Sequence, residues 1–180
     1  QVMGQRHNDI RNNLEAPPKI NLNTIMQFVS RPSWCLNMMT AKKLNFGNIM
    51  GHVTNVTNLS SLASWTADQF DPTLTWEDIA WIKDRWKGKL ILKGIMDSED
   101  AMLAVKAGAD AIIISNHGGR QLDGAPSTIS VLPEIVDAVN SKVEVHFDGG
   151  VRSGQDVLKA LALGADCIHI GRPYVYGLGA

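Results

Sequence analysis

Residues 111–120 have the sequence Ala-Ile-Ile-Ile-Ser-Asn-His-Gly-Gly-Arg, and this stretch decides the fold. Its four apolar residues predict a short strand that is buried on both faces, as in a parallel sheet. The polar residues and glycines that follow directly predict a loop at the carboxyl end of that strand. In parallel α/β proteins the functional groups lie on such loops.

Apolar runs on either side of this stretch predict further strands at residues 90–93, 143–147 and 167–170. Amphipathic patterns between the runs predict helices that start at Asp97 or Ser98, within 129–139, and at about Ser153. Glycines at 108 and 164 are expected to stop the first and last of these helices. Pro133 lies inside the middle pattern, so that helix is expected to start there.

The chain contains an internal repeat. Asp100 with Gly108-Ala109-Asp110 is matched by Asp156 with Gly164-Ala165-Asp166. Strands and helices that alternate and repeat predict parallel strands joined by crossover helices. An open doubly wound sheet and a (β/α)8 barrel both fit this pattern. No Gly-x-Gly-x-x-Gly follows the first strand, which disfavours the dinucleotide-binding fold.

The two ends of the chain suggest a piece of a larger barrel. Four strands make half of a (β/α)8 barrel, and the chain opens on Gln1 rather than Met. It ends at Ala180 shortly after the last predicted strand, where no further helix is expected. We therefore expect residues 1–180 to be a fragment, whose four strands are consistent with half a barrel.

The first half of the chain is less regular. Residues 75–78, Thr-Trp-Glu-Asp, resemble a capping box and predict a helix start. Residues 12–71 are expected to form a long loop, which is interrupted by prolines at 17–18 and 32. Loops of this length are usually lids, binding loops or partner surfaces. Apolar residues between 25 and 39 favour a substrate lid, with a membrane surface as the alternative.

Composition excludes several classes of protein. The chain has 180 residues, 44% of them hydrophobic, and a formal net charge of −1, which gives no basic footprint for nucleic acid. No apolar run is long enough to span a membrane. Cys35 and Cys167 form no disulfide framework and no Cys/His cluster in the sequence, so we expect idle thiols in a reducing compartment and no metal site. The histidines within strands, His146 and His169, and the tryptophans are expected to be packing residues.

The loops after the last two predicted strands indicate a phosphate site. They contain Gly149, Gly150, Val151 and Arg152 after Asp148, and then Gly171 and Arg172. Glycines let the backbone approach an anion, a helix N-terminus points N–H groups at it, and arginine adds paired donors. The alternative is that the glycines serve only tight turns. Asp148 suits a hydroxyl-bearing chain better than a phosphate.

His117 and Arg120 indicate acid–base chemistry on a small carboxylic acid. A histidine takes up a proton near neutral pH, and an arginine three residues further on is placed to hold a carboxylate. A hydrogen-bonded structural histidine is the alternative. Lys93 ends a buried strand as a charged group that needs an acceptor or a counter-charge, so a structural ion pair is its alternative.

Residues 115–123, Ser-Asn-His-Gly-Gly-Arg-Gln-Leu-Asp, resemble the signature of the FMN-dependent 2-hydroxy acid dehydrogenases and oxidases. Gly4-Gln5-Arg6 with Asp9-Ile10-Arg11-Asn12 is similar to that family's segment after barrel strand 4. The resemblance implies that residues 1–180 form the C-terminal half of a single FMN-binding TIM (β/α)8 barrel domain, with strands 5–8 and the end of strand 4. It also implies that the family's first four strands, and the aspartate that orients its catalytic histidine, lie outside this chain.

The resemblance implies a role for each matching residue. His117 is the catalytic base, and Arg120 and Arg6 hold the substrate carboxylate. Lys93 and Ser115 contact the flavin ring, with Lys93 near its N1/O2 edge, and Asp148 contacts the ribityl chain. The phosphate is held by the residues of the last two loops, namely Gly149, Gly150, Val151, Arg152, Gly171 and Arg172.

The implied activity is FMN-dependent oxidation of an L-2-hydroxy acid, with L-lactate as the first choice, by hydride transfer to the flavin. The resemblance further implies a quinone, cytochrome or oxygen as electron acceptor, a homo-oligomeric parent, and a cytoplasmic location with peripheral contact to the inner face of the membrane through residues 12–71. Two alternatives stay open. One is another FMN- or phosphate-binding barrel, such as an FMN-dependent isomerase. The other is a half-barrel that binds no flavin and is not an enzyme.

Overall fold

The computed structural model describes residues 11–12, 20–41, 61, 65, 73–122 and 124–179. The chain divides into two compact units, one covering Val2–Pro72 and the other Thr73–Ala180 together with Gln1. Arg6, which the resemblance assigns to the substrate carboxylate, lies outside the described residues.

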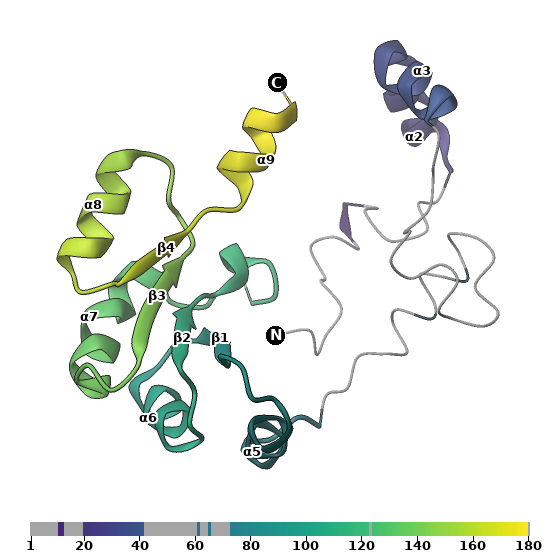
Figure 1. The fold of residues 1–180 in the computed structure, drawn as a ribbon. Helices are drawn as coiled ribbons and strands as arrows, with labels where there is room; N and C mark the ends of the chain where they lie inside the picture. Colours follow the sequence, from purple (N-terminus) through teal and green to yellow (C-terminus); the bar gives the residue numbers. More distant parts are fainter. Residues whose placement is uncertain are drawn as a thin grey trace. The chain divides into compact units, whose positions relative to one another are not determined.

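The unit that contains Thr73–Ala180 is built on a four-stranded parallel sheet. Its strands are β1 (Ile91–Ile95), β2 (Ala111–Ile114), β3 (Glu144–Asp148) and β4 (Cys167–His169), in the order β1-β2-β3-β4. Figure 1 shows helices α6 (Ser98–Lys106), α7 (Thr128–Val139) and α8 (Gly154–Ala162) on one side of this sheet. The predicted parallel strands and crossover helices are therefore confirmed.

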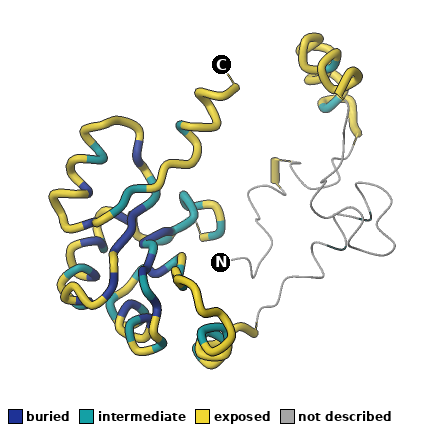
Figure 2. Tube along the Cα trace, in the orientation of Figure 1, coloured by how far each residue is buried: buried dark blue, intermediate teal, exposed yellow. Residues whose placement is uncertain are grey.

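The core lies between the sheet and these helices. Ile114 and Phe147 point from neighbouring strands into it and are 0% and 2% exposed, and Leu132 and Ile135 of α7 are fully buried against them. The tube in Figure 2 shows the buried residues running along the strands and along the sides of the helices that face them. One face of the sheet is thus committed to packing, which leaves the other face for a site.

The opposite face of the sheet carries polar side chains. Lys93, Ile113, His146 and Cys167 lie side by side across the four strands, because the strands pair in register at these residues. Side chains alternate along a strand, so this row points away from the core residues next to it. The sequence contains no Cys/His motif, but the fold brings Cys167 together with His146 and His169.

The repeat in the sequence corresponds to two matching strand–helix–strand segments, β1–α6–β2 (the first repeat) and β3–α8–β4 (the second repeat). Each helix is followed by a glycine with positive φ, +79° at Gly108 and +100° at Gly164. In the first repeat Asp110 accepts the N–H of Leu90 at 2.9 Å. In the second, Asp166 accepts the N–H of Val145 at 2.8 Å. The aspartate after each helix therefore ties it to the start of the preceding strand.

Asp110 also binds two lysines, and one of them, Lys83, connects the first repeat to helix α5 (Trp76–Arg85). Its carboxylate accepts from Lys83 Nζ at 2.7 Å and from Lys89 Nζ at 2.9 Å. The hydrogen bond from Lys83, the N–H of Leu90 and the bond from Lys89 hold the pKa of Asp110 well below its usual range. The start of α5 matches the predicted capping box, since the N–H of Thr75 donates to Asp78 at 2.7 Å.

Two helix boundaries differ from the sequence expectation. Helix α7 starts at Thr128 rather than at Pro133, which sits inside the helix. Thr128 is buried and its hydroxyl donates to the carbonyl of Gly149 at 3.5 Å, so a tertiary contact fixes an earlier start. A further helix, α9 (Arg172–Gly179), follows β4, where none was expected. Arg172 therefore lies at the start of a helix shortly after the end of β4.

Three tryptophans expected to be packing residues are exposed. Trp81 and Trp86 are each 57% exposed, and Trp34 is 49% exposed. Residues five apart on an α-helix point about 140° away from one another, so this spacing cannot keep Trp76, Trp81 and Trp86 on one buried face. Arg85 instead covers the Trp81 ring, with its guanidinium carbon 4.0 Å from the ring centroid.

The other unit contains two short helices where the sequence suggests an irregular loop. They are α2 (Leu22–Val29), capped by Asn21, and α3 (Pro32–Thr40), which has its proline in the first turn. Proline is favourable there because the first turn of a helix leaves its N–H groups unbonded. Phe28 stacks on Trp34 with ring centroids 5.5 Å apart, which joins the two helices. Neither helix has a buried residue.

Candidate active site

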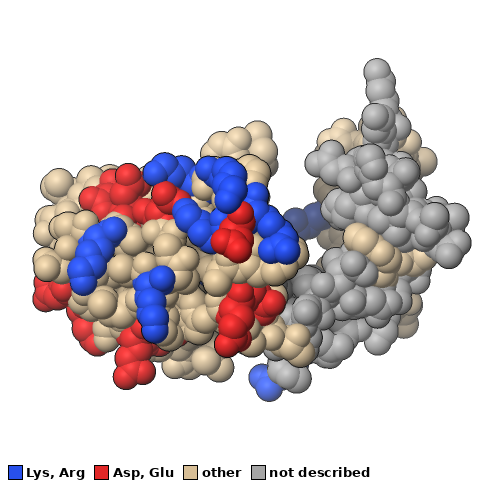
Figure 3. Space-filling model, turned by 60° about the horizontal axis from the view of Figure 1, so that its bottom comes forward, with Lys and Arg blue, Asp and Glu red and all other residues tan. Residues whose placement is uncertain are grey.

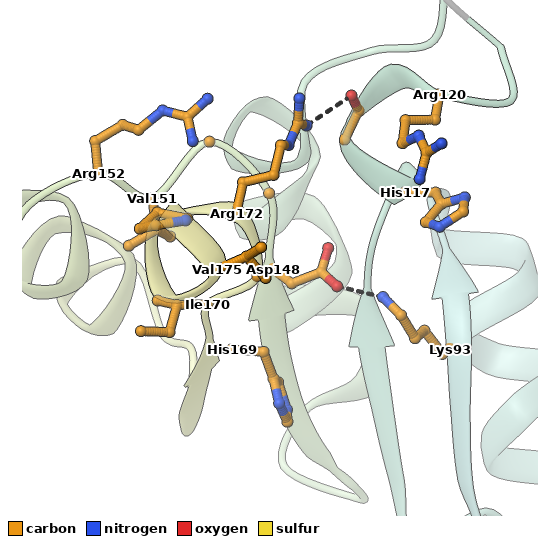
Figure 4. A pocket seen from close by; sticks show the side chains of 15 residues that line it. Lys93, His117, Arg120, Asp148, Val151, Arg152, His169, Ile170, Arg172 and Val175 are labelled. Carbon is orange, nitrogen blue, oxygen red and sulfur yellow. Dashed lines mark hydrogen bonds and ion pairs between the residues drawn. The ribbon is translucent and has the colours of Figure 1, made fainter. Parts of the chain in front are cut away.

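A pocket of about 340 Å³ opens at the carboxyl ends of the four strands. A volume in this range suits a small-molecule ligand. Figure 4 shows basic side chains around it, with Arg152 and Arg172 at one end and Arg120, His117 and Lys93 at the other. The pocket is lined by Lys93, His117, Gly118, Arg120, Asp148, Gly149, Gly150, Val151, Arg152, His169, Ile170, Gly171, Arg172, Pro173 and Val175.

Lys93 is held at the end of β1 by two neighbours. Its ammonium group pairs with the carboxylate of Asp148 and donates to the hydroxyl of Ser115 at 2.6 Å. The register of β1 against β2 shifts between Lys93 and Ile95, so Gly94, with φ of +105°, forms a bulge. Bulges beside active sites re-aim side chains. The counter-charge that Lys93 needs is Asp148, and the pair lies across the pocket.

Ser115 lies behind the pocket lining. Its side chain is fully buried, and its hydroxyl accepts from Lys93 and from the N–H of His117, the latter at 3.2 Å. One hydroxyl therefore links the lysine at the end of β1 to the histidine loop after β2. This contact fixes the position of His117 relative to Lys93.

The histidine loop has an unusual backbone. His117, Gly118 and Gly119 have φ values of +57°, +66° and +72°, and His117 is one of few residues other than glycine with positive φ. Such conformations are costly for residues with a Cβ and occur at functional sites where the surroundings enforce them. Here Asn116 enforces the turn, because its side chain accepts the N–H of Gly118 at 2.9 Å. The Nδ1 atom of His117 is shielded from solvent.

Arg172 joins the histidine loop to the loop after β4. Its Nη2 atom donates to the carbonyl of Gly118 at 3.0 Å, the contact drawn as a dashed line in Figure 4. A Cβ on Gly118 would lie 2.0 Å from that nitrogen, closer than any real contact. The positive φ therefore favours glycine at 118, and a larger residue there would also displace the end of the Arg172 side chain.

The other end of the pocket is suited to an anion. Gly149 and Gly150 have φ values of +100° and +76°, and Arg152 follows them. The N–H groups of Arg152 and Ser153 donate to Asp156 at 3.0 and 2.9 Å. These bonds, that of Arg152 first, lower the pKa of Asp156.

These two N–H groups lie before α8, which begins at Gly154, so they are not the helix N–H groups that the sequence predicts at the phosphate. That expectation stays a prediction. The side chains of Arg152 and Arg172 and the glycine backbone that precedes Arg152 are further groups suited to an anion.

The structure brings most of the predicted site residues together. Ser115 lies behind the pocket, Arg6 lies outside the described residues, and the remaining predicted residues line the pocket. Sequence reasoning assigned no role in the site to Gly118, His169, Ile170, Pro173 and Val175. His169 is placed by strand register opposite Asp148, a signal that becomes available only once β3 and β4 are aligned.

The charges on this unit are mixed in sign. On the face that Figure 3 presents, basic side chains gather beside acidic ones rather than forming a uniformly basic surface. The arrangement agrees with the balanced composition and with a small anionic ligand bound in a pocket rather than a nucleic acid bound across a face. Among the described residues, none of the helices is both long enough and apolar enough to cross a membrane.

A parallel α/β sheet whose strand ends carry glycine loops, arginines and a histidine around one pocket is typical of enzymes that bind a phosphate-bearing cofactor. The chain belongs to the FMN-dependent dehydrogenase family, whose model matches residues 1–180. An L-lactate dehydrogenase of Vibrio cholerae serotype O1 is 42% identical over 99% of this chain and 47% of that relative. One of Vibrio parahaemolyticus is 43% identical with the same coverage.

Solved structures give the same family. The monotopic membrane protein (S)-mandelate dehydrogenase matches with a TM-score of 0.88 at 35% identity, over 97% of this chain and 46% of that one. Mandelate oxidase with benzoyl-formic acid matches with a TM-score of 0.59 at 52% identity, over 62% of this chain and 33% of that one. The chain thus spans about half the length of the relatives it matches. Its four parallel strands correspond to about half of a TIM-barrel FMN dehydrogenase, as predicted.

The residues of the pocket fit FMN, the cofactor of this family. A Cβ on Gly149 would lie 2.9 Å from the hydroxyl of Thr128, so glycine leaves room for the buried threonine and lets the loop take its positive φ beside the pocket. Arg152 and Arg172 suit a phosphate, Asp148 in the middle suits sugar-like hydroxyls, and Lys93 suits an electron-rich ring edge. The order of these groups along the pocket matches the order of the parts of FMN.

Proposed function

We propose that the protein containing this chain oxidises an L-2-hydroxy acid, with L-lactate as the first substrate, to the 2-oxo acid in an FMN-dependent reaction. The observation that supports this most strongly is that His117, Arg120 and Lys93 line one pocket together with Arg152 and Arg172. The first three supply a base, a carboxylate partner and a cation, and the last two supply a phosphate site.

His117 is the base in this proposal. Since its Nδ1 atom is shielded from solvent, we assign proton transfer to Nε2, which takes the proton from the substrate hydroxyl. FMN, when bound, accepts the hydride from the substrate carbon. Arg120, and Arg6 by resemblance, hold the substrate carboxylate, which orients the hydroxyl toward His117.

Lys93 places a positive charge on the pocket floor, where negative charge develops as the flavin is reduced. Asp148 pairs with it and Ser115 accepts its hydrogen bond, so the ammonium group is oriented before substrate binds. Groups oriented in advance stabilise a developing charge better than water does, because they need not reorganise during the reaction.

The direct test is anaerobic reduction of the flavin-loaded protein. L-lactate should bleach the flavin absorbance, D-lactate should not, and glycolate and (S)-mandelate report how large a side chain the site accepts. Bleaching by (S)-mandelate alone would move the substrate to the aromatic acids. A protein that binds FMN but is bleached by none of these acids would contradict the proposal. A protein that binds no flavin would support the remaining alternative, a half-barrel that is not an enzyme.

Arg120→Lys tests the carboxylate contact. Lysine keeps the charge but lacks the planar pair of donors, so kcat/KM for L-lactate should fall by about 10–100-fold, the value of one charged hydrogen bond. Steady-state kinetics with lactate as the varied substrate measures this. Unchanged kcat/KM would place the carboxylate site elsewhere.

We also infer that helices α2 and α3 make peripheral contact with a membrane. Both helices lack charged residues, and Leu22, Met26, Leu36 and Met39 are each at least 66% exposed. Helix α2 is amphipathic, and amphipathic helices with a free apolar face lie in the interface of a bilayer. Helix α3 has no pronounced apolar face and contributes exposed apolar side chains. Replacing Met26 and Met39 with Gln should move the protein from sedimented lipid vesicles to the supernatant. Unchanged sedimentation with slower turnover would instead favour a substrate lid.

A further inference from the structure

Three side chains with metal-binding atoms gather on the pocket-facing side of β3 and β4. Cys167 lies opposite His146 in the register of these strands, and His169 lies two residues further along β4. The side chains between them, including Phe147, point the other way into the core. The Cys167 sulfur and ring nitrogens of both histidines all lie within 4.8 Å of one another.

The two histidines face each other through ring nitrogens. His146 Nδ1 is 3.1 Å from His169 Nε2, and the other nitrogen of His146, Nε2, is 3.2 Å from a carboxylate oxygen of Glu144. In metal sites the ligating histidine usually donates its second N–H to a carboxylate, which fixes the ring and raises its basicity. Glu144 occupies that position here. His146 is 8% exposed, so few waters compete for its nitrogen.

We propose that His146, Cys167 and His169 bind a transition-metal dication such as Zn²⁺, with Glu144 positioning His146. Zn²⁺ binds imidazole nitrogen at about 2.0–2.1 Å and thiolate sulfur at about 2.3 Å, which puts ligand atoms of a tetrahedral site about 3.3–3.6 Å apart. The observed 3.1 Å between the two nitrogens is close to such an edge. One thiolate and two imidazoles select Zn²⁺ or copper over Mg²⁺ and Ca²⁺, which prefer oxygen ligands.

The site adjoins the flavin pocket but does not depend on the proposed oxidation. His169 lines that pocket, and its ring points away from Arg152 and Arg172 in Figure 4. Its neighbour in the register, Asp148, pairs with Lys93. Because Lys93 already occupies the Asp148 carboxylate, we assign the fourth coordination position of the cation to a water molecule on the pocket side of the sheet.

The test is metal binding to the reduced, tag-free chain. One equivalent of Zn²⁺ should bind in competition with a chromogenic chelator, and Co²⁺ should give a thiolate-to-cobalt charge-transfer band. Cys167→Ser should remove that band, and both Cys167→Ser and His169→Gln should weaken Zn²⁺ binding at least tenfold. Glu144→Gln should weaken it about 10–100-fold, as expected for loss of a carboxylate behind a ligand.

Cys35→Ser is the matched control, because it removes the other thiol from helix α3 and leaves the three ligands intact. It should bind Zn²⁺ and Co²⁺ as the parent does, and circular dichroism should show that every variant is folded. The proposal is overturned if the parent binds less than one equivalent, or if the Cys167 and His169 variants bind as it does. Loss of the cobalt band in Cys35→Ser would also overturn it.

Discussion

The first and second repeats each have an aspartate at the third residue of the helix, Asp100 in α6 and Asp156 in α8. The folded protein shifts the pKa values of these two carboxyl groups in opposite directions. In the first repeat burial raises the pKa of Asp100, and the charges of Asp97 and Glu99 raise it further. In the second repeat hydrogen bonds from Arg152 and Ser153 lower the pKa of Asp156. The difference begins at the N-cap residue, which is Asp97 in one repeat and Ser153 in the other.

The far ends of the two helices are alike. Ala109 donates to the carbonyl of Ala104 and Ala165 to that of Ala160, each at 3.1 Å. A strand–helix–strand segment thus keeps one set of closing contacts for the fold. The entry, which is the segment between the strand end and the helix N-cap, differs between the repeats. It follows Lys93 in the first repeat and contains residues 149–152, which we propose bind an anion, in the second.

The largest expected effect is the difference in stability between alanine substitutions at Gly108 and at Gly164, the glycines that follow the two helices. A Cβ on Gly164 would lie 2.8 Å from Val136 Cγ1, whereas one on Gly108 meets only the Lys83 side chain at 3.8 Å. Gly164→Ala should lower the free energy of unfolding by about 3 kcal/mol, from backbone strain and overpacking together. Gly108→Ala should cost about 1–2 kcal/mol, from strain alone. Urea denaturation measures both, and equal losses would show that Val136 moves aside freely.

The entry loops should differ in what they contribute to the site. Arg152→Met should weaken FMN binding by about 1.5–3 kcal/mol, or about 10–150-fold, because it removes charged hydrogen bonds to the phosphate. Lys93→Met should weaken FMN binding less and slow reduction by substrate more. Fluorescence titration and stopped-flow reduction of both variants measure the two quantities. The division of roles is wrong if Lys93→Met is the variant that loses the flavin.

The smallest effects concern the two aspartates and differ in sign. The pKa of Asp156 is lowered in the folded protein, so its charge stabilises the fold above the ordinary value of 3.8 and this is lost as the pH falls through the lowered value. The pKa of Asp100 is raised, so its charge opposes folding at neutral pH.

Asp156→Asn should therefore lower the denaturation midpoint at neutral pH, and Asp100→Asn should raise it. Both differences from the parent should shrink in acid, as the parent carboxyl groups become protonated. Thermal denaturation across a pH series provides the measurement. Shifts of the same sign in the two variants would contradict the opposite pKa shifts.

Local patterns in the sequence were sufficient to predict most strands of the sheet and many of the residues that line the pocket. The predicted strand at 111–114 matches β2, and the predicted stop at Gly108 follows α6 directly. Lys93 directly follows an apolar run and His117 lies three residues after one, and strand ends in parallel α/β folds carry sites, so both could be predicted. These features depend on residues close together in the chain.

Features that depend on distant pairing were not predictable in the same way. The Cys167 cluster requires the register of β3 against β4, which places residues more than twenty positions apart side by side. The earlier start of α7 reflects the contact between Thr128 and Gly149, which competes with the local preference of Pro133. Helices α2 and α3 have only eight and nine residues, a length at which a sequence pattern does not separate a helix from a loop.

The central claim is that the pocket uses His117 as a base, and flavin-loaded His117→Ala tests it most directly. The phosphate end of the pocket is intact in this variant, so it should bind FMN as the parent does. Its flavin reduction by L-lactate, followed anaerobically in a stopped-flow instrument, should be slower by about 10²–10⁴-fold, the loss expected for a positioned general base. A flavin-loaded variant that is reduced at nearly the parent rate would contradict the account.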